Sequence, residues 1–248
     1  FLDGLEDAYE GGLMGSFAQT TADAFGLSRK AMDDFAIYSL SKANSAIADG
    51  VLESEIEAVE ITTRKGKVRV TTDEQPGQAR IDKIPQLRAA FKKEGTITAA
   101  NASSISDGAS ALVLASETAV AKNNLTPAAH IVGVQSFARE PSDFTLAPIG
   151  AVQGLLKSID WQVKDVDLFE INEAFAMVTM LATKELGLDS SKVNIYGGAC
   201  AQGHPIGSTG SRIIVTLMTA LKNQGLKRGV AALCIGGGEA TAVAIELV

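Results

Sequence analysis

From residue 127 onward the sequence alternates short apolar runs with longer stretches of helical periodicity. Apolar runs of this length indicate buried strands, and their alternation with helices predicts a layered α/β fold in which the helices pack on a sheet. Only glycines separate the last two runs, which predicts a hairpin at the end of a mixed sheet. The strands are expected at about 129–137, 165–171, 193–196, 229–236 and 240–247, and the helices at about 148–159, 173–186 and 206–224.

Residues 1–103 are more polar and predict a separate, mixed α+β region. Ser28 is expected to cap a long helix that Gly50 ends. Two strand-like runs follow, IEAVEIT and KVRVTT, and the turn RKG joins them. The next segment, DEQPGQARIDKIPQLRAAF, has two prolines and little periodicity, so it predicts an extended surface loop. Residues 104–126 then predict a loop, a buried strand and a short helix.

The composition is that of an ordinary globular chain, because 248 residues with 46% hydrophobic content can bury a sizeable core. A net charge of −7 argues against a nucleic-acid surface, which needs clustered basic residues. The longest apolar runs, such as AALCI and ALVLA, are far too short to cross a bilayer, so no membrane span is expected. Two cysteines in separate settings do not make a disulfide framework, which fits a reducing compartment and a cytoplasmic location.

Two glycine-rich segments carry the side chains best suited to chemistry. GGACAQGHPIGSTGSR (197–212) contains His204, and CIGGGEA begins with Cys234. A thiol and a nearby imidazole can exchange protons near neutral pH, while flanking glycines let a substrate approach the backbone and let N–H groups face an oxyanion. Cys200 is interpreted as structural, and His130 as a packed core residue in an apolar run.

Five motifs in this sequence resemble those of one family. NEAFA at 172–176, GGACAQGHPIGSTGSR and CIGGGEATAVAIEL occur in the order and at about the spacing found in thiolases, the acyl-CoA C-acyltransferases. TAANASSISDGASALVL and GLEDAYEGGLMG resemble two further thiolase segments. The resemblance implies a thiolase-like C-terminal α/β domain at 127–248 and a thiolase loop domain at 1–103. Residues 104–126 would be a strand and helix that complete a preceding half.

The resemblance also implies an activity: Claisen condensation or thiolytic cleavage of 3-ketoacyl-CoA such as acetoacetyl-CoA, with the coenzyme A thioester as substrate and no separate cofactor. His204 resembles the base that activates a nucleophilic cysteine, and Asn172 the residue that positions a water in the same oxyanion site. Cys234 resembles the acid/base at the acyl α-carbon, and Gly236 would offer its N–H to a second oxyanion hole. The residues that resemble the lining of a coenzyme A tunnel are Leu5, Met14, Phe91, Ala99, Ser103 and Phe175.

Other features of the resemblance limit what this chain is expected to do alone. In thiolases the nucleophilic cysteine lies in a first half that precedes the loop domain, and neither cysteine here stands in such a motif. The chain is therefore expected to need a thiolase N-terminal half as partner, and to form a homodimer or homotetramer. Leu13 stands where many acetoacetyl-type thiolases carry a histidine, so a short-chain preference does not carry over directly.

Plainer interpretations of the same residues stay open. Cys234 could be a small core residue, His204 a capping or core histidine, and Asn172 the N-cap of the helix that follows it. Phe91 and Phe175 could be core aromatics. A zinc site built on Cys200, His204 and Cys234 lacks the usual paired spacing, and a dinucleotide-binding fold lacks its GxGxxG motif. The main competitor is a non-catalytic chain that binds coenzyme A or a partner chain without acyl transfer.

Overall fold

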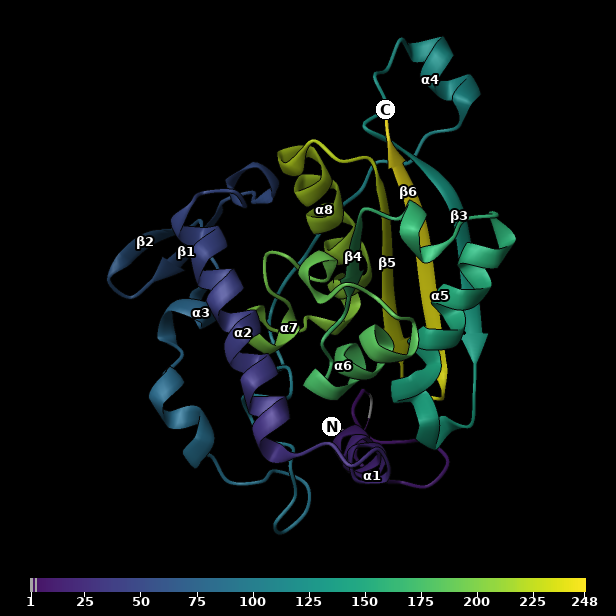
Figure 1. Ribbon diagram of the computed structural model, residues 1–248. Coiled ribbons are helices and arrows are strands. Elements are labelled where there is room, and N and C mark those ends of the chain that lie inside the picture. The colour runs from purple at the N-terminus through teal and green to yellow at the C-terminus, as the bar shows by residue number, and fades with distance from the viewer. Residues whose placement is uncertain (1, 3) are drawn as a thin grey trace.

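The computed structural model describes residue 2 and residues 4–248. At its centre is a mixed sheet with the strand order β3-β6-β5-β4 (Figure 1). The β3–β6 and β5–β6 pairs are antiparallel, whereas β4 and β5 run parallel. The predicted mixed sheet and its terminal hairpin are therefore confirmed. The bounds are β3 (Ala129–Ala138), β4 (Leu168–Ile171), β5 (Arg228–Ile235) and β6 (Glu239–Leu247).

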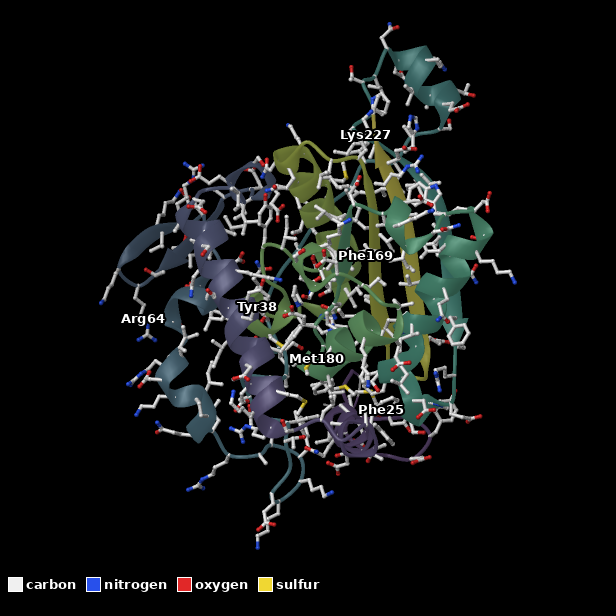
Figure 2. The ribbon with its side chains drawn as sticks, viewed as in Figure 1. Phe25, Tyr38, Arg64, Phe169, Met180 and Lys227 are labelled. Atoms are coloured by element: carbon white, nitrogen blue, oxygen red, sulfur yellow. The ribbon has the colours of Figure 1, made fainter. Side chains whose placement is uncertain are left out.

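Helices pack on both faces of this sheet. Helix α5 (Ala147–Ser158) contacts β3 and β6, whereas α8 (Ile206–Gln224) contacts β4 and β5. Successive strand residues point to opposite faces, so Phe169 belongs to the core under α5 and its neighbour Leu168 to the core under α8. Phe169 lies at the centre of the molecule in Figure 2. Helix α6 (Ala176–Glu185) follows β4 and packs beside α2 and α5.

Most of the N-terminal part forms a layer beside the α8 side of the sheet, whereas its first helix, α1, lies below α6 (Figure 1). Ser28 caps α2 as predicted, because its Oγ accepts a hydrogen bond from the Ala31 N–H at 3.1 Å. Gly50 follows the helix end with φ of +68°, which suits glycine. The two predicted strands form the β1–β2 hairpin. The elements are α1 (Met14–Ala24), α2 (Arg29–Ala48), η1 (Glu53–Glu55), β1 (Val59–Thr63), β2 (Gly66–Val70), α3 (Glu74–Gln78) and η2 (Ile81–Gln86).

Short elements connect these layers, and the loops among them carry several of the candidate site residues. The remaining 3-10 helices are η3 (Pro141–Leu146), η4 (Val163–Asp165) and η5 (Ser190–Lys192), and the short α-helices are α4 (Glu117–Asn123) and α7 (Ala199–Gln202). The domain boundaries at residues 103 and 126 stay predictions.

Two predicted strands are not formed. Residues 106–116 have no strand structure, and Val113 and Leu114 are 95% and 73% exposed. An apolar run becomes a strand only where another strand satisfies its backbone groups, and α4 lies well away from the sheet (Figure 1). Residues 193–196 make only a single bridge between Val193 and Phe169.

The prediction for His130 was half right. His130 lies in the predicted strand, now β3, and pairs with Glu246 of β6. Its side chain is exposed rather than packed in the core. Because β3 is an edge strand and alternate residues face outward, an apolar sequence around a residue does not decide which face it occupies.

Candidate active site

A cavity of about 470 Å³ gathers nine of the ten predicted site residues. Its lining includes His204, Cys234 and Gly236, together with every residue predicted for the coenzyme A tunnel: Leu5, Met14, Phe91, Ala99, Ser103 and Phe175. Asn172 is the exception, since it is buried beside His204 rather than in the lining. Segments that are far apart in sequence therefore converge on one site.

The parallel pairing of β4 and β5 places two of these residues at the same edge of the sheet. Ile171, the last residue of β4, pairs with Ala232 of β5, and the Asn172 N–H donates to the Ala232 carbonyl at 2.9 Å. Cys234 comes two residues after Ala232, near the end of β5. His204 joins them from the segment between α7 and α8.

The aromatic residues of the cavity also stabilise the fold around it. The rings of Phe91 and Phe175 meet edge to face with their centroids 6.2 Å apart, and both belong to the surrounding hydrophobic cluster. Gly15 leaves room for Phe91, because a Cβ there would lie 2.2 Å from the ring. Ser103 donates from its N–H and its Oγ to the Ala174 carbonyl at 3.0 and 2.9 Å. Phe91 and Phe175 therefore pack in the core and line the cavity at the same time.

Two hydrogen bonds orient the His204 ring. Its Nδ1 lies 2.6 Å from Thr209 Oγ1, and that hydroxyl donates to the Pro205 carbonyl at 3.0 Å. Because the hydroxyl proton is used there, Nδ1 carries the ring proton and donates to Thr209. Nε2 is then the acceptor, and it lies 3.3 Å from Asn172 Nδ2. This arrangement leaves a proton-accepting nitrogen on the Asn172 side of the ring.

Burial sets the protonation states of the titrating side chains. It lowers the pKa of His204 to about 4, with the positive charge of Arg212 contributing in the same direction. Burial raises the pKa of Cys234 to about 12 and moves the pKa of Cys200 well above its ordinary value, where Glu173 adds to the effect. At neutral pH the imidazole is therefore uncharged and both thiols are protonated. The site can accept a proton at His204 and donate one from Cys234.

Asn172 does not cap the helix that follows it. The N-cap position of α6 is Phe175, and it makes no side-chain capping bond. Asn172 is 2% exposed, and its Oδ1 has no hydrogen-bond partner among the described residues. An unpaired buried acceptor costs about 1–3 kcal/mol, so this oxygen is available to a water or a ligand. The Asn172 side chain therefore faces His204 and does not cap α6.

Four of the eight glycines in the two segments, Gly197, Gly198, Gly203 and Gly238, are required by close packing against other parts of the chain. A Cβ on Gly197 would lie 2.6 Å from the Ser39 carbonyl oxygen, and one on Gly203 would lie 2.1 Å from Ser106 Oγ. Gly238 has φ of +96° and makes the turn between β5 and β6. Gly236 is different, because it lines the cavity against Met14 Sδ. Only there does the missing side chain give room in the site itself.

Two residues with a clear part in this geometry were missed from the sequence. Thr209 lies five residues after His204, a spacing that puts both near the start of α8. Glu173 stands directly after Asn172 and makes buried hydrogen bonds behind the site. Glu173 is an acidic residue within the largely apolar run LFEINEAFAMV, which was the available signal, whereas Thr209 lies in GSTGSR, where its neighbours give no such signal. Cys200 lies outside the cavity lining, with its Sγ 3.8 Å from the Glu173 carbonyl oxygen.

The comparisons with known proteins agree with this geometry. The model of the thiolase C-terminal domain matches residues 125–247, and the model of the thiolase N-terminal domain matches residues 1–118. The chain belongs to the thiolase family. Among curated thiolases, acetyl-CoA acetyltransferases of Saccharomyces cerevisiae and Schizosaccharomyces pombe are 46% and 47% identical to it. These matches cover 98% and 99% of this chain but 62% and 63% of the relatives.

Solved thiolase structures show the same fold. The acetyl-CoA acetyltransferase of Bacillus anthracis superposes with a TM-score of 0.95 at 39% identity, over 98% of this chain and 62% of that one. The Acat5 thiolase of Ascaris suum, solved in complex with coenzyme A, gives 0.91 at 42% identity, over 99% and 63%. The chain therefore spans about three fifths of the length of its relatives.

Neither a membrane-spanning helix nor a metal-ligating cluster occurs among the described residues. In the part of the chain that the structure describes, no helix is long and apolar enough to cross a membrane. The same residues contain no cluster of three or more histidine, cysteine or acidic side chains that could hold a metal ion.

The burial of His204 predicts a pH effect on stability. Its folded-state pKa of about 4 lies below the ordinary value of 6.5, so between these values the unfolded chain binds the proton more readily. The free energy of unfolding should fall as the pH drops through this window. Urea unfolding at several pH values would measure it, with the His204→Gln variant showing a smaller decrease. Protonation of the folded-state imidazole near pH 6.5, seen by histidine-selective NMR, would contradict the assignment.

Proposed function

We propose that this chain supplies the histidine and second-cysteine side of a thiolase active site that cleaves or forms 3-ketoacyl-CoA thioesters such as acetoacetyl-CoA. The observation that carries the proposal is the single cavity that contains His204, Cys234 and Gly236. The apolar lining suits the long, thin pantetheine arm of coenzyme A. The names of the relatives, acetyl-CoA acetyltransferases, and the coenzyme A complex of the Ascaris suum protein support the same class of reaction. No cofactor beyond the thioester is needed for it.

His204 acts as the base in this proposal. A neutral imidazole with Nε2 free to accept a proton can deprotonate the thiol of the nucleophilic cysteine. Once Nε2 carries that proton, it can donate to the thioester oxygen. Asn172 Nδ2, 3.3 Å away, belongs to the same oxyanion site, and its unpaired Oδ1 can hold the water that completes it.

Cys234 acts as the acid in the cleavage direction. When the Cα–Cβ bond of a 3-ketoacyl-CoA breaks, the electron pair passes to the α-carbon of the leaving acetyl-CoA, and that carbon takes the proton from Cys234 Sγ. The thiolate is then reprotonated by the incoming coenzyme A thiol, which attacks the acyl-enzyme. A thiol with a pKa near 12 is fully protonated before the reaction, as the acid of this step must be. The Gly236 N–H supplies the second oxyanion hole.

The partner in this proposal is a thiolase N-terminal half that carries the nucleophilic cysteine. The exposed apolar run ALVLA, with Val113 and Leu114 among the most exposed hydrophobic residues, would form a strand in its sheet. The match to about three fifths of each relative agrees with a further domain in the complete enzyme. Exposed Val59, Ile61 and Val68 on the β1–β2 hairpin support assembly into a homodimer or homotetramer.

The chain alone should show no thiolase turnover, because neither of its thiols can act as the acyl acceptor. Thiolysis of acetoacetyl-CoA, followed by its ultraviolet absorbance, should appear only when the chain is produced together with a thiolase N-terminal half. Solubility should improve at the same time. Turnover by the purified chain alone, abolished in Cys234→Ala, would mean that the nucleophile is misassigned. Coenzyme A binding without turnover in the assembled protein would favour the non-catalytic alternative.

The Cys234→Ala substitution should separate the two half-reactions. In the assembled enzyme, labelled acyl-CoA should still acylate the nucleophilic cysteine at close to the normal rate, because that step needs His204. Condensation and proton exchange at the acyl α-carbon should be abolished, because the variant lacks the acid/base. A variant that condenses at the normal rate would reduce Cys234 to a core residue.

Substitutions of Asn172 and of His204 should lower turnover by different amounts. Loss of a single oxyanion-hole donor costs about 10²–10³ in turnover, so Asn172→Ala should fall in this range with little change in coenzyme A affinity. His204→Ala should cost more, because it removes the base together with an oxyanion donor. Steady-state kinetics of the two variants in the assembled enzyme test the assignment, and equally small losses in both would refute it.

A further inference from the structure

The strongest feature outside the proposed chemistry is a buried carboxylate directly behind it. Glu173 is 1% exposed and does not line the catalytic cavity. Its carboxylate accepts hydrogen bonds from Ser39 Oγ at 2.7 Å, Asn194 Nδ2 at 2.9 Å and the Cys200 N–H at 3.1 Å. It lines a separate cleft of about 310 Å³ between α2 and α6, whose lining also includes Tyr38 and Met180, both labelled in Figure 2.

The partners of Glu173 require a group that only accepts hydrogen bonds. The Asn194 amide nitrogen and the Cys200 N–H can only donate, and the Ser39 hydroxyl already accepts from the Gly198 N–H at 2.9 Å. A glutamine would turn an NH₂ group toward at least one of these donors. Gly198 is fitted to the carboxylate as well, because a Cβ there would lie 2.3 Å from Glu173 Cδ.

These contacts reach the segment that carries Asn172. The Asn194 side chain accepts from the Ile171 N–H and donates to the Ile171 carbonyl, both at 2.8 Å, while its Nδ2 also reaches Glu173. The backbone of Ile171, directly before Asn172, is therefore held by one side chain, and that side chain also bonds the carboxylate of Glu173, directly after Asn172. The direction of the Asn172 amide follows from this restraint.

The same carboxylate reaches the segment that carries His204. Cys200 lies in α7, a helix of only four residues (Ala199–Gln202), and Gly203 and His204 follow it directly. So short a helix has little stability of its own, and the bond from the Cys200 N–H to Glu173 fixes its first turn. Glu173 therefore contacts the supports of both Asn172 and His204.

We propose that Glu173 is a positioning residue that sets the Asn172–His204 contact by tying the end of β4 to α7. Glu173 touches neither the cavity that contains His204 nor the substrate. Its effect on rate rests on the function proposed above, whereas its effect on the geometry of His204 is independent of that function. A small displacement of a catalytic group can cost about 10²-fold in rate, so a residue of this kind should influence turnover more than binding.

Kinetics of the enzyme assembled with a thiolase N-terminal half give the first test. Glu173→Gln should lower kcat about 10- to 100-fold, with KM for acetoacetyl-CoA changed by less than about twofold. Glu173→Asp, which keeps an acceptor-only group, should retain more activity than Glu173→Gln. In an Asn172→Ala background the same Gln substitution should cost less than about threefold, because both act through one contact. The matched control is Glu185→Gln at the exposed end of α6, which should behave as wild type.

An NMR measurement tests the same inference without any activity. The chain has two histidines, so selective labelling gives two imidazole signals. In Glu173→Gln the His204 signal should shift and titrate at a higher pH than in wild type, because the ring becomes more hydrated, while exposed His130 stays unchanged as an internal control. Ser39→Ala, which removes one of the three bonds, should give a smaller change in the same direction and serves if the Gln variant does not fold.

The two measurements separate the possible failures. Unchanged kcat and an unchanged His204 signal in folded Glu173→Gln would overturn the positioning role. Additive losses in the Asn172→Ala background would also overturn it, because Glu173 would then act independently of the contact. If the wild-type assembly lacks turnover, the proposed function fails, and the His204 signal alone decides whether Glu173 positions the ring.

Discussion

The parallel pairing of β4 with β5 is the interaction on which the site depends. It brings the carboxyl ends of two strands to one edge of the sheet, and the bond from the Asn172 N–H to the Ala232 carbonyl extends their register beyond the end of β4. Cys234 then emerges two residues further along β5. The strand ends alone would leave the site open, because His204 comes from neither. It is placed by α7 and α8, which pack between the sheet and the N-terminal layer.

Burial gives this site its chemical character. Removal from water disfavours the charged form of each titrating group, so the His204 imidazole is neutral and the Cys234 thiol keeps its proton. An exposed site with the same residues would hold a partly charged imidazole and a more acidic thiol. The same burial leaves Asn172 Oδ1 without a hydrogen-bond partner among the described residues. This costs free energy that an amide capping a helix would not lose. In the function proposed above, this acceptor holds the water of the oxyanion site.

The N-terminal layer does more than cover the sheet. Met14 at the start of α1 and Phe91 after η2 complete the cavity wall, and Ser39 of α2 reaches the carboxylate behind the site. Residues from both parts of the chain are therefore needed for one cavity and for its support. At the opposite end the apolar run around Val113 is left exposed, since its neighbours in the described structure offer no strand to pair with. Residues of both parts of the chain therefore line the cavity, whereas the run around Val113 packs against no strand of the described structure.

The sequence by itself determined the elements whose signals are local. Apolar periodicity placed β3, β5, β6, α5 and α8 to within a residue or two, and the Ser28 cap and Gly50 bounded α2. The resemblance to thiolases identified nine residues that share a cavity. Only the tertiary structure decided the rest. Whether an apolar run becomes a strand depends on continuous pairing with another strand. The segment at 193–196 makes a single bridge to β4, and the run around Val113 pairs with no strand of the described structure. Whether His130 faces core or solvent depends on which side of β3 is covered, and whether Asn172 caps a helix or faces His204 depends on contacts far away in sequence. The partners of Glu173 come from residues 39, 194 and 200, a convergence that no spacing in the sequence encodes because only folding brings these segments together.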